Sequence, residues 1–128
     1  MQNKTIEWII LVTDKFEESR NFYKNTLGLE IIREVPAEHF SQFAMENCNL
    51  AIYGRNELEA LVGENHIGNP GGAIYTFAET SDVYGLYQLL ADQGVEFIKE
   101  PKTQSWGQRT AYFTDPDGHI WEIQQWVE

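Results

Sequence analysis

The segment from Arg109 to Glu128, which reads RTAYFTDPDGHIWEIQQWVE, carries the clearest indication of the fold. Two runs rich in apolar residues flank the sequence Asp115-Pro116-Asp117-Gly118. Proline presets φ at the first corner of a turn, and aspartate followed by glycine tolerates the left-handed region at the second corner. The segment therefore predicts a β-hairpin, with strands at 109–114 and 119–126.

The second strand of this hairpin carries one acid, Glu122, among apolar residues. Because side chains alternate across a strand, Glu122 shares a face with Ile120 and Gln124, and Trp121 is expected in the core on the opposite face. An ionised carboxylate in apolar surroundings is costly unless it is paired, hydrogen-bonded, hydrated or bound to a metal. Glu122 is therefore the first candidate for a functional residue, and a solvated strand face is the alternative.

The same order of elements is expected twice along the chain. The pattern of the first half predicts a strand at 6–12 and then a helix that runs to about 27. Asp14 is the expected N-cap of this helix, with Glu17 three residues later. Strands are expected next at 29–35, 40–45 and 50–53. The second half predicts a strand at 73–78, a helix that begins after Asp82 and ends at Gly94, and strands at 95–98, 109–114 and 119–126. Gly28-Leu29-Glu30-Ile31 corresponds to Gly94-Val95-Glu96-Phe97 in this comparison.

This repetition predicts an α+β fold of two βαβββ modules within a single domain of 128 residues. The modules are expected at about 1–62 and 72–128, joined by the loop 63–71, which is rich in Gly and Asn. Each module should form a curved, barrel-like mixed sheet with its helix on the outside. Neither half has a complete core, so we expect the modules to pair within the chain or across a homodimer.

Composition narrows the classes of partner. The formal net charge is −11, and the acids are scattered along the chain, which argues against nucleic acid and against anionic membrane surfaces. No apolar run is long enough to cross a membrane, and the N-terminal sequence does not resemble a secretory signal. The single cysteine, Cys48, cannot form an internal disulfide, so a cytoplasmic location is expected.

The chain resembles the vicinal oxygen chelate superfamily, which includes glyoxalase I, bleomycin-resistance and fosfomycin-resistance proteins and extradiol dioxygenases. The resemblance rests on the double βαβββ order and on four segments: Val12-Thr13-Asp14 leading to Phe22-Tyr23 and Leu27-Gly28, the segment 90–101, Trp106-Gly107, and the segment 115–122. It covers nearly the whole chain, and it implies a concave site for a small organic molecule. The motifs are specific for the superfamily but for none of its activities.

The resemblance also implies positions for metal ligands and acid–base groups. Glu7, seven residues before Asp14, falls at the first-strand position, and Glu122, four residues after Gly118, falls at the closing-strand position. Both are catalytic candidates, and their oxygens suit a divalent ion in an open site. The second half departs from the pattern, because it offers Ile74 or Tyr75 where the family has His. The cofactor expectation is therefore either no cofactor or one divalent metal ion.

Five further residues are candidates for contact with a small-molecule ligand. Trp106 and Trp126 could form apolar walls, Arg109 could bind an anionic group, and Tyr75 and Phe43 could add an oxygen ligand and aromatic surface. For each of them, packing in the core or pairing at the surface is the alternative.

Two functions remain open from the sequence. The first is a metal-free binding protein of the bleomycin-resistance type, whose acidic, aromatic groove sequesters a drug-like molecule or metabolite. The second is a metal-dependent lyase or isomerase of the glyoxalase type, which acts through an enediolate. The missing histidine favours the binding protein, and the retained Glu7 and Glu122 favour the enzyme.

Overall fold

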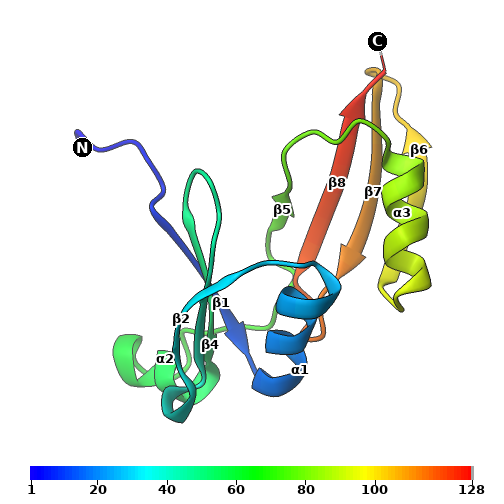
Figure 1. Ribbon diagram of the computed structural model, residues 1–128. Coiled ribbons are helices and arrows are strands. Elements are labelled where there is room, and N and C mark those ends of the chain that lie inside the picture. The colour runs from blue at the N-terminus through cyan, green and yellow to red at the C-terminus, as the bar shows by residue number, and fades with distance from the viewer. Residues whose placement is uncertain (128) are drawn as a thin grey trace. The chain divides into compact units, whose positions relative to one another are not determined.

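The structure is a computed structural model that describes residues 1–127, so Glu128, the last residue of the predicted second module, lies outside the described residues. The chain divides into two compact units, Met1–Gly68 and a second unit that begins at Asn69. The division falls within the segment 63–71. Each unit contains one four-stranded sheet, and each is described here by itself (Figure 1).

The first unit contains four strands in the spatial order β1-β4-β3-β2, with β1 parallel to β4 and the remaining pairs antiparallel. Its elements along the chain are β1 (Trp8–Thr13), α1 (Phe16–Asn21), the π-helical turn η1 (Phe22–Thr26), β2 (Ile31–Val35), the 3-10 turn η2 (Pro36–Glu38), β3 (Phe40–Phe43), β4 (Asn49–Gly54) and α2 (Arg55–Val62).

The core of the first unit lies between its sheet and α1–η1. Tyr23 is fully buried and packs on Phe43, with 5.3 Å between ring centroids. The strand register places Phe43 beside Leu50, and Leu11 beside Ile52, on the same side of the sheet. Apolar burial on this side stabilises the contact between helix and sheet, because area removed from water is the main favourable term.

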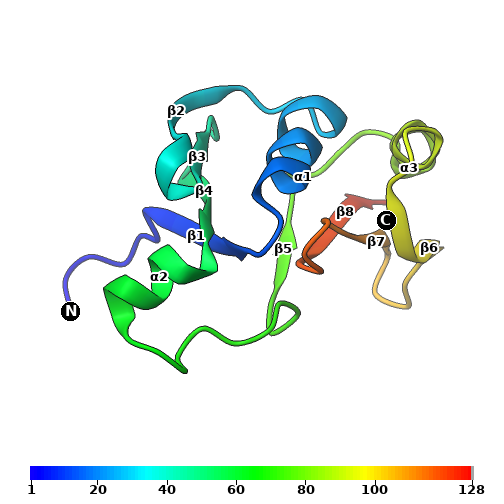
Figure 2. The same ribbon diagram turned by 90° about the horizontal axis from the view of Figure 1, so that it is seen from below.

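The second unit repeats the arrangement, with the spatial order β5-β8-β7-β6 and β5 parallel to β8. Its elements are β5 (Ile74–Thr76), α3 (Val83–Asp92), β6 (Glu96–Thr103), β7 (Gln108–Thr114) and β8 (Ile120–Trp126). Helix α3 lies along β6 and β7, as both ribbon views show (Figures 1 and 2). The Asp82 side chain accepts a hydrogen bond from the Gly85 amide, which confirms the predicted N-cap of this helix.

Aromatic rings fill the core of the second unit. Trp121 is 3 % exposed and stacks on Phe77 at 4.6 Å, and Phe113 contacts both Phe77 and Phe97. Tyr87 of α3 packs edge-on against Phe97, which identifies this face of the sheet as the face that α3 covers. The predicted core position of Trp121 is confirmed.

The turn between β7 and β8 forms as the sequence predicts. The Asp115 carboxylate accepts hydrogen bonds from the amides of Asp117 and His119, at 3.0 and 2.8 Å, and Gly118 has φ +99°. Asp115 is 5 % exposed, so its side chain replaces water as the partner of these amides. The turn sets the register in which Glu122 lies opposite Tyr112.

The predicted α+β class and the double βαβββ order are confirmed, with several differences in detail, among them β6, which runs to Thr103 and not to 98. Each described sheet is open and does not close into a barrel. Helix α2 was not expected, although Leu58, Leu61 and Val62 follow a helical spacing. The predicted cap at Asp14 is wrong: within the described residues the N-cap of α1 is Lys15, and no side chain caps that helix.

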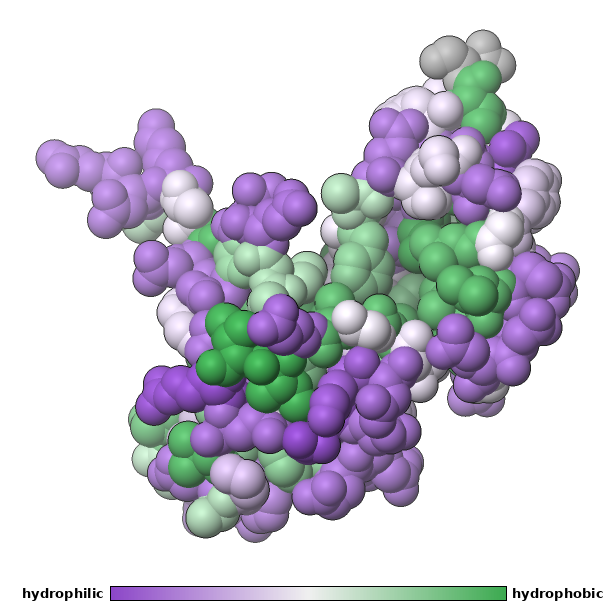
Figure 3. Space-filling model, in the orientation of Figure 1, coloured by the Kyte–Doolittle hydropathy of each residue, from purple (hydrophilic) through white to green (hydrophobic). Residues whose placement is uncertain are grey.

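The face of the protein that Figure 3 draws is predominantly hydrophilic, in agreement with the net charge. In the face that Figure 3 shows, hydrophilic side chains cover most of each unit, and smaller apolar areas are also exposed. None of the helices in residues 1–127 has the length and apolar character needed to cross a membrane.

Candidate functional site

The face of the second sheet opposite α3 presents a row of polar side chains, one from each strand. The register places Thr76 of β5 beside Glu122 of β8, Glu122 beside Tyr112 of β7, and Tyr112 beside Lys99 of β6. Because neighbouring residues of a row point to the same side of a sheet, these four side chains share one face, which we call the open face.

Both oxygens of the Glu122 carboxylate accept hydrogen bonds from hydroxyl groups. The Thr76 hydroxyl donates to Oε1 at 2.8 Å, and the Tyr112 phenol donates to Oε2 at 2.5 Å. Hydrogen bonds to a charged acceptor are short and strong, so two donors from the flanking strands hold the carboxylate in one orientation. Hydrogen bonding is therefore what stabilises this carboxylate, among the possibilities that the sequence left open.

The phenol of Tyr112 remains protonated to higher pH than an ordinary tyrosine. Burial raises the pKa of Tyr112, and the hydrogen bond to Glu122 raises the pKa of Tyr112 further, because ionisation would place two negative charges together. The Tyr112 hydroxyl is therefore fixed as a donor to Glu122, and its oxygen also has the Thr110 side chain as a hydrogen-bond partner, which lowers the pKa of Tyr112.

A second group of polar contacts continues along the open face toward the end of β8. The Gln108 amide donates to the Gln124 side chain at 3.1 Å, and the Trp106 indole donates to the Gln108 side chain at 2.9 Å. Trp126 lies beside Gln108 in the register, and both tryptophans are more than half exposed. Two exposed indoles thus flank the amide pair.

A cavity of about 240 Å³ lies at the β6 side of this face. The residues that line it are Lys99, Glu100, Lys102, Gln104, Thr110 and Tyr112. Two lysines, one glutamate and one phenol therefore border this hollow, and the phenol is the group that donates to Glu122. The predicted groove was acidic, whereas the charges on this face are of both signs.

Three of the predicted ligand-binding residues lie elsewhere. Tyr75 alternates with Thr76 and packs on Trp121 at 5.3 Å, on the side of the sheet that α3 covers. Arg109 lies over the ring of Tyr84 of α3 at 4.7 Å and donates to the Thr103 hydroxyl at 3.1 Å.

Phe43, the third of these residues, belongs to the first unit. Its side chain is fully buried against Tyr23, in the core under α1–η1. Core packing, the alternative considered for aromatic residues at strand spacing, therefore describes Phe43.

Glu7 is exposed and lies one residue before β1, in the first unit. Its backbone oxygen accepts hydrogen bonds from the amide and the side chain of Asn49, at 2.7 and 3.1 Å. By alternation Glu7 is on the side of Leu11, and the residues that β1 presents to the opposite side are Trp8 and Ile10, both exposed.

The residues on the open face do not fit a metal centre within the second unit. Glu122 is the carboxylate of the row, and its neighbours across the strands are two hydroxyls that already donate to it. In residues 1–127, no group of three or more His, Cys, Asp or Glu side chains is arranged to hold a metal ion. A divalent ion would require further anionic or imidazole donors in place of these hydroxyls.

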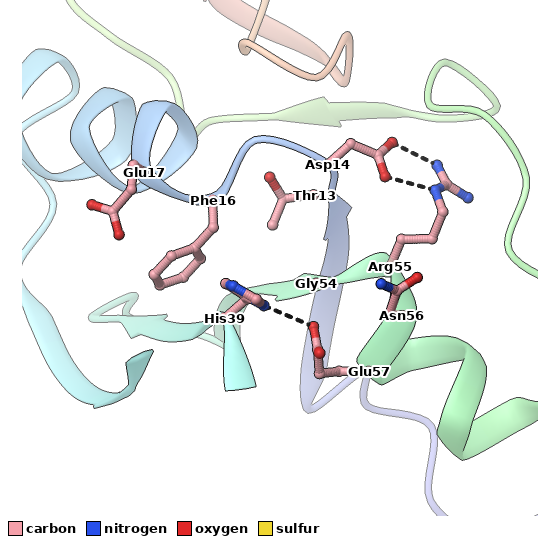
Figure 4. Close-up of a pocket in the computed structure, with 9 residues that line it drawn as sticks. All are labelled: Thr13, Asp14, Phe16, Glu17, His39, Gly54, Arg55, Asn56 and Glu57. Carbon is pink, nitrogen blue, oxygen red and sulfur yellow. Dashed lines mark hydrogen bonds and ion pairs between the residues drawn. The ribbon is translucent and has the colours of Figure 1, made fainter. Parts of the chain in front are cut away.

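The first unit contains a separate hollow of about 340 Å³, at the ends of β1 and β4 (Figure 4). Two polar pairs lie on its sides, and the first of them is an ion pair. Arg55 donates to both oxygens of Asp14, at 2.8 and 3.0 Å, and His39 Nδ1 lies 3.1 Å from Glu57 Oε1. The Arg55 guanidinium also donates to the backbone oxygen of Ile67 at 2.8 Å.

These pairs connect segments that are distant in the sequence. The hydrogen bond from Arg55 holds the pKa of Asp14 below its usual value, so the pair remains ionised at neutral pH. A Cβ at Gly54 would collide with the Glu57 carboxylate and lie 3.0 Å from the His39 Cβ, so the close approach of Glu57 requires glycine. The contacts of this hollow therefore attach α2 to β1 and to the turn before β3.

Sequence reasoning identified Glu122 but missed the residues that surround it. Tyr112 and Thr76 belong to the site because strand pairing brings them to Glu122. Tyr112 is 10 positions from Glu122 in the sequence, and Thr76 is 46 positions from it. Alternation along β7 could have placed Tyr112 on the face opposite Phe113, once the hairpin register was fixed. The partner on β5 could not be found in this way, because a parallel pair has no turn that fixes its register.

The double βαβββ fold and the position of Glu122 on its closing strand agree with a single protein family. The family model of the Glyoxalase/Bleomycin resistance protein/Dioxygenase superfamily matches residues 5–123, and the chain belongs to this superfamily. Among its relatives, the uncharacterized protein YraH of Bacillus subtilis is 30 % identical over 94 % of this chain and 96 % of that protein.

A second relative, the metallothiol transferase FosB of Staphylococcus saprophyticus, is 28 % identical over 94 % of this chain and 76 % of that protein. Among solved structures, a glyoxalase-related enzyme from Fulvimarina pelagi has a TM-score of 0.85 and is 26 % identical, covering 96 % of this chain and 88 % of that one. Both similarities span nearly all of this chain, so they extend over both units.

Proposed function

We propose that this protein binds a small organic molecule on the open face of the second sheet, and that this binding does not depend on a metal ion. The observation that carries the proposal is the double hydroxyl contact of Glu122 with Thr76 and Tyr112. A binding site must hold its polar groups in position before the ligand arrives, and these contacts supply that preorganisation.

The composition of the open face supports this proposal. Polar side chains and two exposed indoles lie on one side of the sheet, whereas the side under α3 is filled by apolar and aromatic rings. Small-molecule sites combine an apolar or aromatic lining with a few placed polar groups, and this face offers both. Membership of a superfamily with small-molecule substrates agrees with this proposal.

A panel of drug-like molecules and metabolites, titrated against the isotope-labelled protein, tests the proposal. Ligands of the site should shift the backbone amide resonances of β7 and β8 and quench tryptophan fluorescence. Thr76→Val and Tyr112→Phe should each weaken binding by about twofold to tenfold, the net contribution of one hydrogen bond that positions Glu122. Trp106→Ala should reduce the fluorescence response.

Arg109→Met supplies a matched control for these variants. Arg109 is a strand residue of β7 like Tyr112, but its side chain lies against Tyr84 on the opposite face, so this substitution should leave ligand affinity unchanged. The proposal fails if a broad panel shifts no open-face resonance, or if Arg109→Met weakens binding as much as Tyr112→Phe does.

The second candidate function is a metal-dependent lyase or isomerase of the glyoxalase type. It is favoured by the position of Glu122, four residues after Gly118, and by the relative that is named a metallothiol transferase. In this alternative, Glu7 would be a further ligand or an acid–base partner of Glu122. The hydroxyl neighbours of Glu122 argue against it, and metal analysis of the protein separates the two functions.

The assembly state belongs to the same proposal. Trp8 and Ile10 are exposed, and by alternation they lie on the face of the first sheet opposite Leu11. We expect a homodimer, as the family resemblance implied, and light scattering coupled to size-exclusion chromatography tests this expectation. A monomeric mass at working concentrations would contradict it.

A further inference from the structure

The charged groups of the open face lie along one row of the sheet, with the ammonium group of Lys99 toward one end and the carboxylate of Glu122 toward the other. Lys99 lies beside Tyr112 in the strand register, and Tyr112 lies between Lys99 and Glu122. The Tyr112 phenol donates to the carboxylate, not to a group on the lysine side. The row therefore ends in a positive group on β6 and in a negative group beside β5.

Lys102 strengthens the positive end of this row. It lies beside Thr110 in the register, and both lysines line the cavity of about 240 Å³ together with Tyr112. Glu100 also lines this cavity, but its Oε1 lies 3.4 Å from the Tyr87 hydroxyl of α3, toward the covered face. The cavity end of the row thus suits an anionic oxygen group such as a carboxylate or phosphate.

The negative end of the row suits a group that donates hydrogen bonds. Glu122 receives one hydroxyl hydrogen on each oxygen, and a carboxylate offers about four lone-pair positions. The remaining positions of the carboxylate, which lie beside the Tyr112 hydroxyl, can accept from a ligand ammonium or hydroxyl group. An ammonium group would also be attracted by the negative charge of the carboxylate.

We infer that the ligand of the open face is a small zwitterionic molecule, whose anionic end binds at Lys99 and Lys102 and whose ammonium end binds at Glu122 and Tyr112. Lys99 and Glu122 are two strands apart, which is about 10 Å between backbones, and the flexible lysine stem can shorten the distance between the charges. The inference rests on the proposed function, and it adds the chemical class of the ligand.

Linear ω-amino acids provide probes of this arrangement. Titration of the labelled protein with 4-aminobutanoate, 6-aminohexanoate and 8-aminooctanoate, followed by the amide resonances of the open face, gives the dependence of affinity on the distance between charges. Hexanoate and hexylamine are the matched probes with one charge. We expect 6-aminohexanoate to bind at least about tenfold more tightly than either of them, and affinity to peak at one chain length.

Two isosteric variants assign the ends of the ligand. In Lys99→Met, the advantage of 6-aminohexanoate over hexylamine should shrink to the part that Lys102 supplies, whereas in Glu122→Gln its advantage over hexanoate should disappear. Lys24→Met, which removes a lysine of the first unit, is the control and should change neither ratio. Thermal unfolding and the dispersion of amide resonances establish that each variant is folded.

The inference is overturned if hexanoate or hexylamine binds as tightly as the zwitterion, or if Lys99→Met leaves every affinity unchanged. In both cases, open-face ligands from the wider panel would still support the proposed function. A panel in which no molecule shifts open-face resonances would instead contradict the proposed function itself, so the two failures are distinguishable.

Discussion

The phenol of Tyr112 donates a hydrogen bond of 2.5 Å to the carboxylate of Glu122, across the two antiparallel strands that Asp115-Pro116-Asp117-Gly118 connects. The two residues face each other directly in the register of β7 and β8. The turn that fixes the hairpin therefore also fixes the contact at the centre of the proposed site. A slip of one residue would move Tyr112 to the opposite face.

The first prediction concerns the titration of Tyr112. Glu122→Gln removes the negative charge that opposes ionisation of the phenol, so the pKa of Tyr112 should fall toward its ordinary value while burial still holds it above that value. A tyrosinate titration by ¹³C NMR of labelled tyrosine measures this change. Thr76→Val is the control, because it removes the other hydroxyl contact of Glu122 and leaves the Tyr112 contact in place.

An unchanged Tyr112 pKa in Glu122→Gln would mean that the phenol and the carboxylate are not in contact in solution. A fall of equal size in Thr76→Val would mean that the titration reports general loosening of the sheet. Either result would remove the structural basis of the binding proposal.

The second prediction concerns metal content. Protein purified without chelator should contain well below one divalent ion per chain. Addition of Ni, Zn, Mn, Mg or Fe ions should not raise its midpoint of thermal unfolding. The reason is the donor set, since two hydroxyls occupy the positions beside Glu122 where further charged ligands would be needed. Mass spectrometry of the metals and thermal shift measure the two quantities.

A stoichiometric ion that is lost in Glu122→Ala would contradict this prediction and would support the metal-dependent enzyme. Glu7→Ala provides a second comparison. Loss of the ion in both variants would identify the two carboxylates as ligands, as the family resemblance implies. Loss in Glu122→Ala alone would exclude Glu7 from the site.

The sequence predicted the architecture well because its signals were local. Helix α3 lies between Asp82 and Gly94, and the Asp-Pro-Asp-Gly turn connects β7 to β8. Both features could be predicted because capping and turn chemistry depend on residues within a few positions. Asp14 shows the limit of such signals. Its cap pattern was present in the sequence, but its carboxylate instead accepts two hydrogen bonds from Arg55, which lies 41 positions away.

The candidate site was predicted less completely, because its members are brought together by strand pairing and by packing. Alternation predicted that Trp121 and Glu122 face opposite sides of β8, and aromatic stacking identifies the side of Trp121 as core. The same rule could not show that Tyr75 lies on the core side, since the sequence left both Ile74 and Tyr75 open as the residue at the ligand position of the family. Parallel pairing with β8 determines it.

The third prediction concerns the turn at Asp115. Asp115→Ala should destabilise the protein by about 1–3 kcal/mol, because two backbone amides lose a buried acceptor. Asp115→Asn retains one oxygen acceptor and should lose less. Urea unfolding measures both free energies, and Asp117→Ala, at a less buried position of the same turn, is the control. Equal stability of the three variants would show that the carboxylate does not hold the turn.

The fourth prediction concerns acid stability of the first unit. Glu34 accepts hydrogen bonds from Arg20 of α1 and from the Ser41 hydroxyl of β3, and the hydrogen bond from Arg20 is the main cause that lowers the pKa of Glu34 to about 2. An acid with a lowered pKa in the folded state stabilises the protein above its unfolded-state pKa. That stability is lost as the pH falls toward the folded-state value.

Glu34→Gln should therefore lower the free energy of unfolding at pH 7 by about 1–2 kcal/mol, a value reduced for the partial exposure of the pair. The difference from the wild type should shrink as the pH falls from about 4.5 to about 2, because the wild-type carboxyl becomes protonated in that range. Urea unfolding at a series of pH values gives the two curves. Glu38→Gln, at an exposed acid of the turn before β3, should run parallel to the wild type, and a Glu34→Gln curve that did the same would show that the ion pair contributes nothing.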